Sequence, residues 1–115
     1  MDFFNIDMNL GWKALDGYPD GIQERILTNT FDEQAGTGRR TRLLRFAPGS
    51  FTTEPFSHTY WEEVLLIEGD MAVADSTGEI HEFEPLTYAC RPPHTPHGPF
   101  RTDGGCLLYE IHYFA

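Results

Sequence analysis

The sequence has few basic residues and almost no lysine. Its 115 residues include seven arginines, the single lysine Lys13 and eighteen acidic residues, and the formal net charge is −10. Nucleic acid phosphates and anionic membrane surfaces attract basic proteins, so we expect neither as a partner. With only one lysine present, covalent catalysis through a lysine Schiff base is also disfavoured.

Cysteines and long apolar runs are equally scarce. Two cysteines, Cys90 and Cys106, do not make a disulfide framework. The opening residues Met1-Asp2-Phe3 lack the basic segment that begins a secretory signal. No apolar run has the length needed to cross a bilayer. We therefore expect a reducing, cytoplasmic location.

Helical periodicity is missing as well, and short apolar segments recur instead between glycine and proline positions. The aromatic content of 14% suits a sheet. These features predict one all-β domain over residues 1–115, a sandwich or small barrel, with an irregular arm at 1–21 and the barrel core at 41–114. The expected strands are 12–15, 22–29, 41–47, 51–58, 63–67, 71–75, 86–91 and 106–114, with Gly104-Gly105 as a hairpin turn before the last.

One stretch, residues 48–69 (PGSFTTEPFSHTYWEEVLLIEG), places a histidine and a carboxylate on an apolar strand. Alternation along this strand points His58 and Glu62 inward and Glu63 outward. Buried imidazole and carboxylate groups are costly unless they are paired or bound. A metal ion satisfies both groups at once.

A second stretch, residues 92–98 (PPHTPHG), supplies His97 after a stiff, proline-rich turn. Two histidines and one carboxylate can form a facial triad that leaves coordination positions open for substrate or oxygen. We therefore predict that His58, Glu62 and His97 bind one divalent metal ion. Fe(II) is the first expectation, and Zn, Ni, Mn and Co are alternatives.

These two stretches resemble the two motifs of the cupins, in particular the small, single-domain RmlC-like type. The first cupin motif is G-x5-H-x-H-x3,4-E-x6-G, and the second is G-x5-P-x-G-x2-H-x3-N. The matching positions are Gly49, His58, Glu62 and Gly69 in the first motif and Pro92 and His97 in the second.

Three positions depart from the cupin pattern. Phe56 stands where the first histidine of the H-x-H pair is expected, His94 replaces the glycine of P-x-G, and Arg101 replaces the final asparagine. The resemblance therefore implies a metal site with one protein ligand fewer than the family pattern provides.

The resemblance implies a double-stranded β-helix, or jelly-roll, barrel. The segments HTYWEEVLLIEGDMAV and RPPHTPHGPF are similar to those of acetylacetone and dihydroxyacetophenone dioxygenases and of ChrR-type sensor domains. This implies a dioxygenase-type enzyme for a small dicarbonyl or hydroxy-ketone substrate. Two alternatives stay open: a non-redox isomerase, lyase or decarboxylase of a small oxo-acid, and a non-enzymatic metal- or metabolite-binding sensor module. The resemblance also implies a homodimer, with the apolar arm and the aromatic last strand as candidate contact surfaces.

Other polar residues have several possible roles. Tyr60 shares the inward face and is a candidate catalytic donor to a substrate oxygen. His94 is a candidate catalytic group too, but it can equally replace the missing ligand or be exposed. We expect His81 at the surface and His112 in a structural role on the polar side of the last strand. Three arginines could each bind a substrate carboxylate, and these are Arg42, Arg91 and Arg101.

The sequence also predicts which side chains face the barrel interior or are buried. The more apolar face of the last strand carries Leu107, Tyr109, Ile111 and Tyr113, whereas Glu110 and His112 share the other face. Cys90 is expected to be a small buried side chain. The residues expected to line the barrel are Phe46, Phe56, Tyr88 and Phe100.

Overall fold

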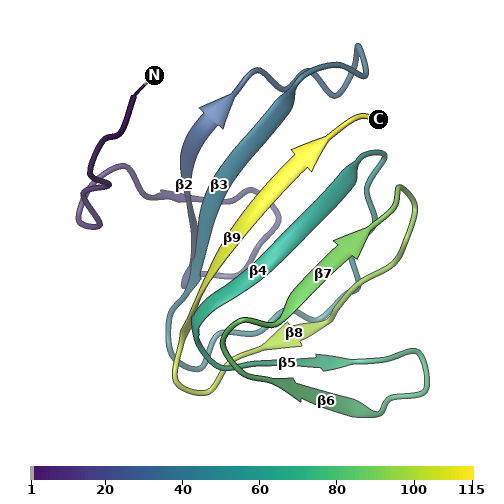
Figure 1. The fold of residues 1–115 in the computed structure, drawn as a ribbon. Helices are drawn as coiled ribbons and strands as arrows, with labels where there is room; N and C mark the ends of the chain where they lie inside the picture. The colour runs from purple at the N-terminus through teal and green to yellow at the C-terminus, as the bar shows by residue number, and fades with distance from the viewer. Residues whose placement is uncertain (1) are drawn as a thin grey trace.

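The structure, a computed structural model, describes residues 2–115 and contains strands and no helix in that range. Figure 1 shows the strands folded into two facing sheets, with the N-terminal arm extending away from them. The strands are β1 (Lys13–Ala14), β2 (Ile22–Asn29), β3 (Arg39–Phe46), β4 (Trp61–Gly69), β5 (Met71–Ala74), β6 (Ile80–Phe83), β7 (Tyr88–Arg91), β8 (Phe100–Arg101) and β9 (Cys106–Tyr113). The all-β prediction is confirmed.

All strand pairs are antiparallel. The larger sheet has the order β1-β2-β3-β9-β4-β7, and the smaller has the order β6-β5-β8. The last strand, β9, lies between β3 and β4, which places Glu62 directly opposite His112 on one side and opposite Arg91 of β7 on the other. This register brings residues that are far apart in the sequence to the same level of the barrel.

Most of the expected strands are present, but β6 and β8 were not among them, and two predicted segments differ. Residues 51–58 form no continuous strand and make only isolated bridges, from Phe51 to Arg101 and from Phe56 to His97. Gly104-Gly105 is not a hairpin turn, because the strands on either side of it, β8 and β9, belong to different sheets. It lies against Gly69 at a crossing between the sheets, where Gly69 has φ +89° and a Cβ atom would overlap the Gly105 carbonyl oxygen.

The expected orientation of the last strand is wrong. Cys106, Leu108, Glu110 and His112 of β9 are buried, and the alternate residues beginning at Leu107 are only partly buried. The more apolar face points outward because the barrel interior around Glu110 and His112 is polar. In this part of the strand the inner face is therefore not the more apolar one. The buried apolar cluster consists of Ile22, Leu44, Phe46, Val64, Leu66, Met71, Cys106 and Leu108.

Three of the four predicted lining residues do face the barrel interior. Phe46 is buried, and Phe56 and Phe100 line the central pocket. Tyr88 is a correction, because it is 58% exposed and donates a hydrogen bond to the outward Glu63. Cys90 is also exposed, since it lies on the outward side of the edge strand β7.

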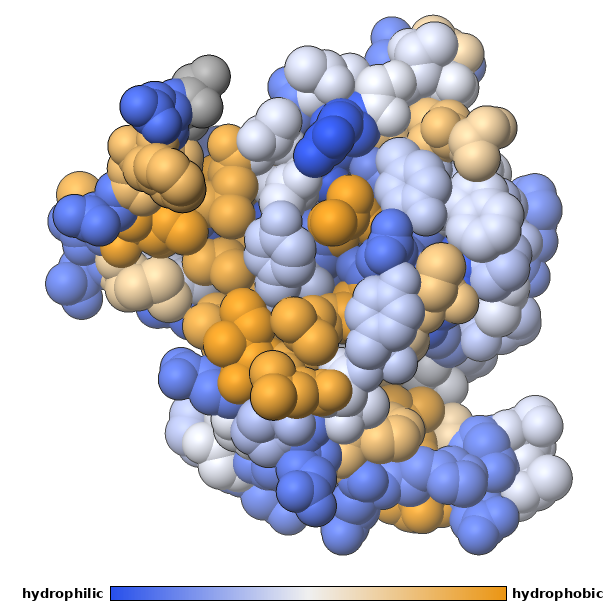
Figure 2. Space-filling view, viewed as in Figure 1, coloured by the Kyte–Doolittle hydropathy of each residue, from blue (hydrophilic) through white to orange (hydrophobic). Residues whose placement is uncertain are grey.

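The N-terminal arm is apolar and exposed. Phe3 has a relative exposure of 102%, and Phe4, Met8 and Leu10 are also exposed. Figure 2 shows apolar side chains gathered on this arm. The arm joins the sheet through β1, which is shorter than the predicted strand, and the Arg45 guanidinium lies 4.0 Å from the Trp12 ring centre. Met1 lies outside the described residues. Within residues 2–115 no helix is long and apolar enough to cross a membrane.

Candidate metal centre

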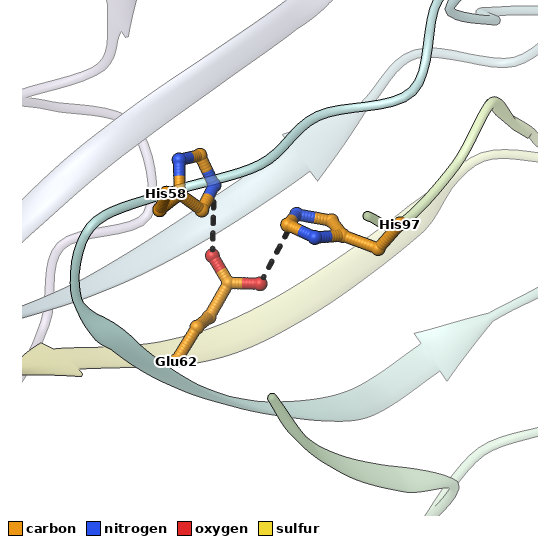
Figure 3. A group of neighbouring side chains, drawn as sticks. All are labelled: His58, Glu62 and His97. Atoms are coloured by element: carbon orange, nitrogen blue, oxygen red, sulfur yellow. Dashed lines mark ion pairs between the residues drawn. The ribbon is translucent and has the colours of Figure 1, made fainter. Parts of the chain in front are cut away.

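The three predicted ligands meet at one end of the barrel. Glu62 lies on β4, His58 lies just before that strand, and His97 lies at the end of the proline-rich segment before β8. His58 Nε2 is 3.7 Å from Glu62 Oε2, and His97 Nε2 is 3.6 Å from Glu62 Oε1. One ligand atom from each residue lies within 4.8 Å of the others. Figure 3 shows both imidazoles turned towards the Glu62 carboxylate.

Backbone hydrogen bonds hold the two histidine segments side by side. The amide of Phe56 donates to the His97 carbonyl over 2.7 Å, and the amide of His97 donates back to Phe56 over 2.8 Å. The amide of His94 donates to the His58 carbonyl at 2.7 Å. The proline-rich turn is therefore fastened to the segment that precedes β4, and the two motifs form one unit.

The pocket beside these ligands is walled by aromatic rings. Phe56 stacks on Tyr18 with ring centres 4.9 Å apart, and Phe100 lies 6.5 Å from Phe56 on another side. The pocket is small, with a cavity volume of about 40 Å³, and Glu62, Arg91 and His97 contribute its polar lining together with Arg42 and Glu110. Phe56 therefore gives the site an apolar wall where another ligand would be expected.

Sequence analysis missed two partners of Glu62. Arg91 Nη1 donates to Oε1 over 2.8 Å, and His112 Nε2 lies 3.0 Å from Oε2. Glu62 is only 3% exposed and His112 is fully buried, so the polar side of the last strand, where we expected a structural His112, faces the interior. The available signal was the alternation of Glu110 and His112 with Leu108, which places two polar groups on one inner face.

Arg40 determines the protonation of His112. The Arg40 Nε–H donates to His112 Nδ1 over 3.0 Å, so Nδ1 carries no proton. The proton of the neutral imidazole is then on Nε2, where it can be donated to Glu62 Oε2. His112 is therefore a partner of the carboxylate and not an additional metal ligand, because a ligating nitrogen must carry a free lone pair.

A second ion-pair network lies next to the pocket. Arg42 contacts Glu110 over 2.8 Å and Glu24 over 2.6 Å, and it is buried. Burial alone would raise the pKa of Glu110, but Arg42 and His112 lower it. Arg42 is thus fully occupied with carboxylates, whereas the third predicted arginine, Arg101, is exposed on β8.

Both ligand histidines are held in the form that binds a metal ion. Burial lowers the pKa of His58 to about 4, despite the opposing effect of Glu62. Burial also lowers the pKa of His97. The His97 Nδ1–H can donate to the Thr95 carbonyl at 3.2 Å, which leaves the lone pair on Nε2 facing Glu62.

The two predicted catalytic groups lie apart from the pocket lining. Tyr60 is buried and stacks on His58 with ring centres 4.6 Å apart, and burial raises its pKa. The His94 side chain is exposed and lies outside the clusters of potential ligands among the described residues. His81 is at the surface as predicted, paired with Asp75 over 2.8 Å. A catalytic role for Tyr60 or His94 stays a prediction.

Known structures share this architecture. The acetylacetone dioxygenase from Acinetobacter johnsonii superposes with a TM-score of 0.72 and 17% identity over 98% of this chain and 74% of its own. An RmlC-like cupin from Shewanella frigidimarina has a TM-score of 0.72 and 18% identity, covering 100% of this chain and 93% of its own. The chain has the cupin fold. The polyketide cyclase RemF from Streptomyces resistomycificus has a TM-score of 0.74 and 18% identity, over 97% of this chain and 79% of its own.

The similarity to cupins lies in the fold and in short motifs, and it does not extend to a match over the whole sequence. No sequence profile of a protein family matches this chain, and no curated protein matches it either. The double-stranded β-helix prediction is confirmed by the structural matches. At identities below 20% these matches establish the fold alone.

The donor set in this cupin barrel fits a divalent metal ion. Two neutral imidazoles and one carboxylate converge, and this combination suits Fe, Mn, Co, Ni or Zn. Glu62 is almost closed to solvent and already pairs with Arg91, so a metal ion there would share its carboxylate with that guanidinium. His58, Glu62 and His97 would hold the ion, and Phe56 would leave one side of it free of protein ligands.

Proposed function

We propose that this cupin is a metal-dependent enzyme of the dioxygenase type that acts on a small dicarbonyl or hydroxy-ketone. The observation that carries the proposal is the convergence of His58, Glu62 and His97 beside an aromatic-walled pocket. The acetylacetone dioxygenase among the similar structures supports the same class of chemistry.

In this proposal, three residues bind the ion and two aromatic rings enclose the pocket. A divalent ion held by His58, Glu62 and His97 supplies Lewis-acid polarisation of a carbonyl group and, if it is iron, a means of using oxygen. The rings of Phe56 and Phe100 bound the pocket and exclude water from its apolar side. Phe56 supplies no ligand atom, so coordination positions on its side of the ion would be left for a substrate that binds through two oxygens.

A non-redox reaction on a small oxo-acid is the second candidate. Arg91 places a guanidinium in the pocket, and a guanidinium is the side chain best suited to a carboxylate. A polyketide cyclase is among the proteins with a similar structure, so this fold is not limited to proteins named as oxygenases. Isomerase, lyase or decarboxylase chemistry would use the same three metal ligands.

Oxygen uptake distinguishes the two candidates. Protein loaded anaerobically with Fe(II) should consume oxygen with at least one member of a panel of 1,3-diketones and hydroxy-ketones, and the metal-free protein and a His97→Ala variant should not. The absence of uptake with every compound, together with turnover of oxo-acids by the Zn- or Ni-loaded protein, would replace the dioxygenase proposal with the second candidate.

A further inference from the structure

Arg91 donates a hydrogen bond to one oxygen of the Glu62 carboxylate. Glu62 and Arg91 are direct cross-strand neighbours on β4 and β7, and Nη1 donates to Oε1 over 2.8 Å. The Glu62 side chain is 4% exposed, whereas that of Arg91 is 20% exposed. The guanidinium therefore reaches the carboxylate from the more open side of the pocket.

The oxygen that Arg91 holds is the one that faces a predicted metal ligand. Oε1 lies 3.6 Å from His97 Nε2, whereas Oε2 is held by His112 and lies 3.7 Å from His58. A cation placed between His97 and Glu62 must therefore share Oε1 with the guanidinium or displace it. Two positive charges this close repel each other strongly in a partly buried site.

The charges around the pocket cancel before a metal ion binds. Two carboxylates line it, those of Glu62 and Glu110, and they are matched by the guanidiniums of Arg42 and Arg91. Arg42 contacts two carboxylates and Arg91 contacts one, so Arg91 is the pocket arginine with fewer competing contacts. A divalent ion would leave the pocket with an excess positive charge that an anionic ligand can neutralise.

We propose that Arg91 determines substrate specificity: metal binding releases it from Glu62, and the freed guanidinium binds the carboxylate of a small oxo-acid. This inference rests on the proposed metal-dependent function and narrows the dicarbonyl class to compounds that bear a carboxylate. Phe100 lies 5.8 Å from the Arg91 guanidinium carbon and supports it at the pocket wall. A carboxylate there would accept two parallel hydrogen bonds from the guanidinium.

The test compares an anion with its neutral ester. Cobalt(II) is titrated into the wild type, Arg91→Met and Arg101→Met, and its visible absorption reports metal binding. Each loaded protein is then titrated with 3-oxobutanoate and with methyl 3-oxobutanoate, which share the two carbonyl oxygens and differ in charge. Arg101 provides the control, since it lies on the neighbouring segment but is exposed.

We expect Arg91→Met to bind cobalt about tenfold more tightly, because no guanidinium competes for Oε1, and to lose about tenfold of the preference for the anion over the ester. Arg101→Met should match the wild type. Arg91→Lys keeps the charge but not the planar fork, so it should keep only part of the preference and serves if Arg91→Met does not fold. An unchanged preference in the Arg91 variants overturns the inference. A wild type that binds no cobalt instead overturns the proposed function.

Discussion

The interior of this barrel has an apolar half and a charged half, and the same three strands build both. On β9 the inward side chains change from Cys106 and Leu108 to Glu110 and His112. The change occurs at the same level on β3, from Leu44 to Arg42. On β4, where Val64 is opposite Glu110, it comes one inward position later, from Val64 to Glu62.

The two halves contribute differently to the molecule. In the apolar half, burial of residues such as Leu66 and Leu108, each 3% exposed, stabilises the fold at about 25 cal/mol per Å². In the charged half, burial is unfavourable unless each group finds a partner, and a hydrophobic replacement would often be as stable. The charged half is therefore best explained by function and the apolar half by stability.

The largest effect is expected when the apolar half is damaged. Leu108→Ala removes a buried side chain from the centre of the cluster and should lower the free energy of unfolding by about 2–5 kcal/mol, because it leaves a cavity. Cobalt(II) affinity of the folded variant should change less than threefold. Chemical denaturation and metal titration measure the two quantities, and a large loss of metal affinity would contradict the division into halves.

In the charged half, His112 should act through Glu62 and not through the metal ion itself. His112→Leu removes a donor from Glu62 Oε2 and the acceptor for Arg40, so we expect metal affinity to fall by about 10- to 100-fold. His112→Gln can accept from Arg40 through its oxygen and donate to Glu62 through its nitrogen, and it should restore most of the affinity. Equal losses in both variants would contradict a positioning role.

The pH dependence of stability should also report on the charged half. Burial lowers the pKa of His58 from its ordinary 6.5 to about 4. In the metal-free protein, the unfolded chain gains a proton at His58 between these values and the folded chain does not, so stability should fall as pH falls through this window. His58 should account for about 2 kcal/mol of this loss, after allowance for its partial exposure.

A matched pair of variants checks the sign of this effect. His58→Asn should flatten the decline in the free energy of unfolding between pH 6.5 and 4, as measured by denaturation at several pH values. Asp75 raises the pKa of His81 on the exposed β5–β6 hairpin, so that pairing stabilises the folded state as pH falls and His81→Asn should not flatten the decline. A steeper decline in His58→Asn would contradict the assignment.

The smallest effect on either half should come from the N-terminal arm. We propose that its exposed apolar residues contact a second copy of the chain, because Phe3, Phe4 and Leu10 are exposed on one short segment. Removing residues 1–10 should shift the protein from dimer to monomer in analytical ultracentrifugation and leave cobalt(II) affinity unchanged. A truncated protein that still sediments with the mass of a dimer would exclude this role.

Sequence reasoning was most reliable where one face of a strand is apolar and where spacing is short. The range of β2 was predicted as it is observed, and alternation correctly distinguished inward Glu62 from outward Glu63. Short spacing joined His58 to Glu62, and the need for a third ligand together with the second cupin motif added His97; the structure brings the three together.

The long-range partners of Glu62 could not be predicted in the same way. Arg91 and His112 reach Glu62 only through strand pairing between distant segments. The register of that pairing cannot be read directly from the sequence. The orientation of β9 was predicted incorrectly because the charged half inverts the usual rule that polar residues face outward. Both misses fall in the charged half, where function overrides local patterning.

The most direct test of this account is the metal content and affinity of the wild type and Glu62→Gln, both purified without chelators or a histidine tag. Glu62 contacts both ligand histidines, so the wild type should contain or take up about one divalent ion per chain. Glu62→Gln should bind that ion at least about 100-fold more weakly. A wild type that binds no ion, or a Glu62→Gln variant that binds it equally well, would contradict the claim that the charged half of the barrel is a metal site.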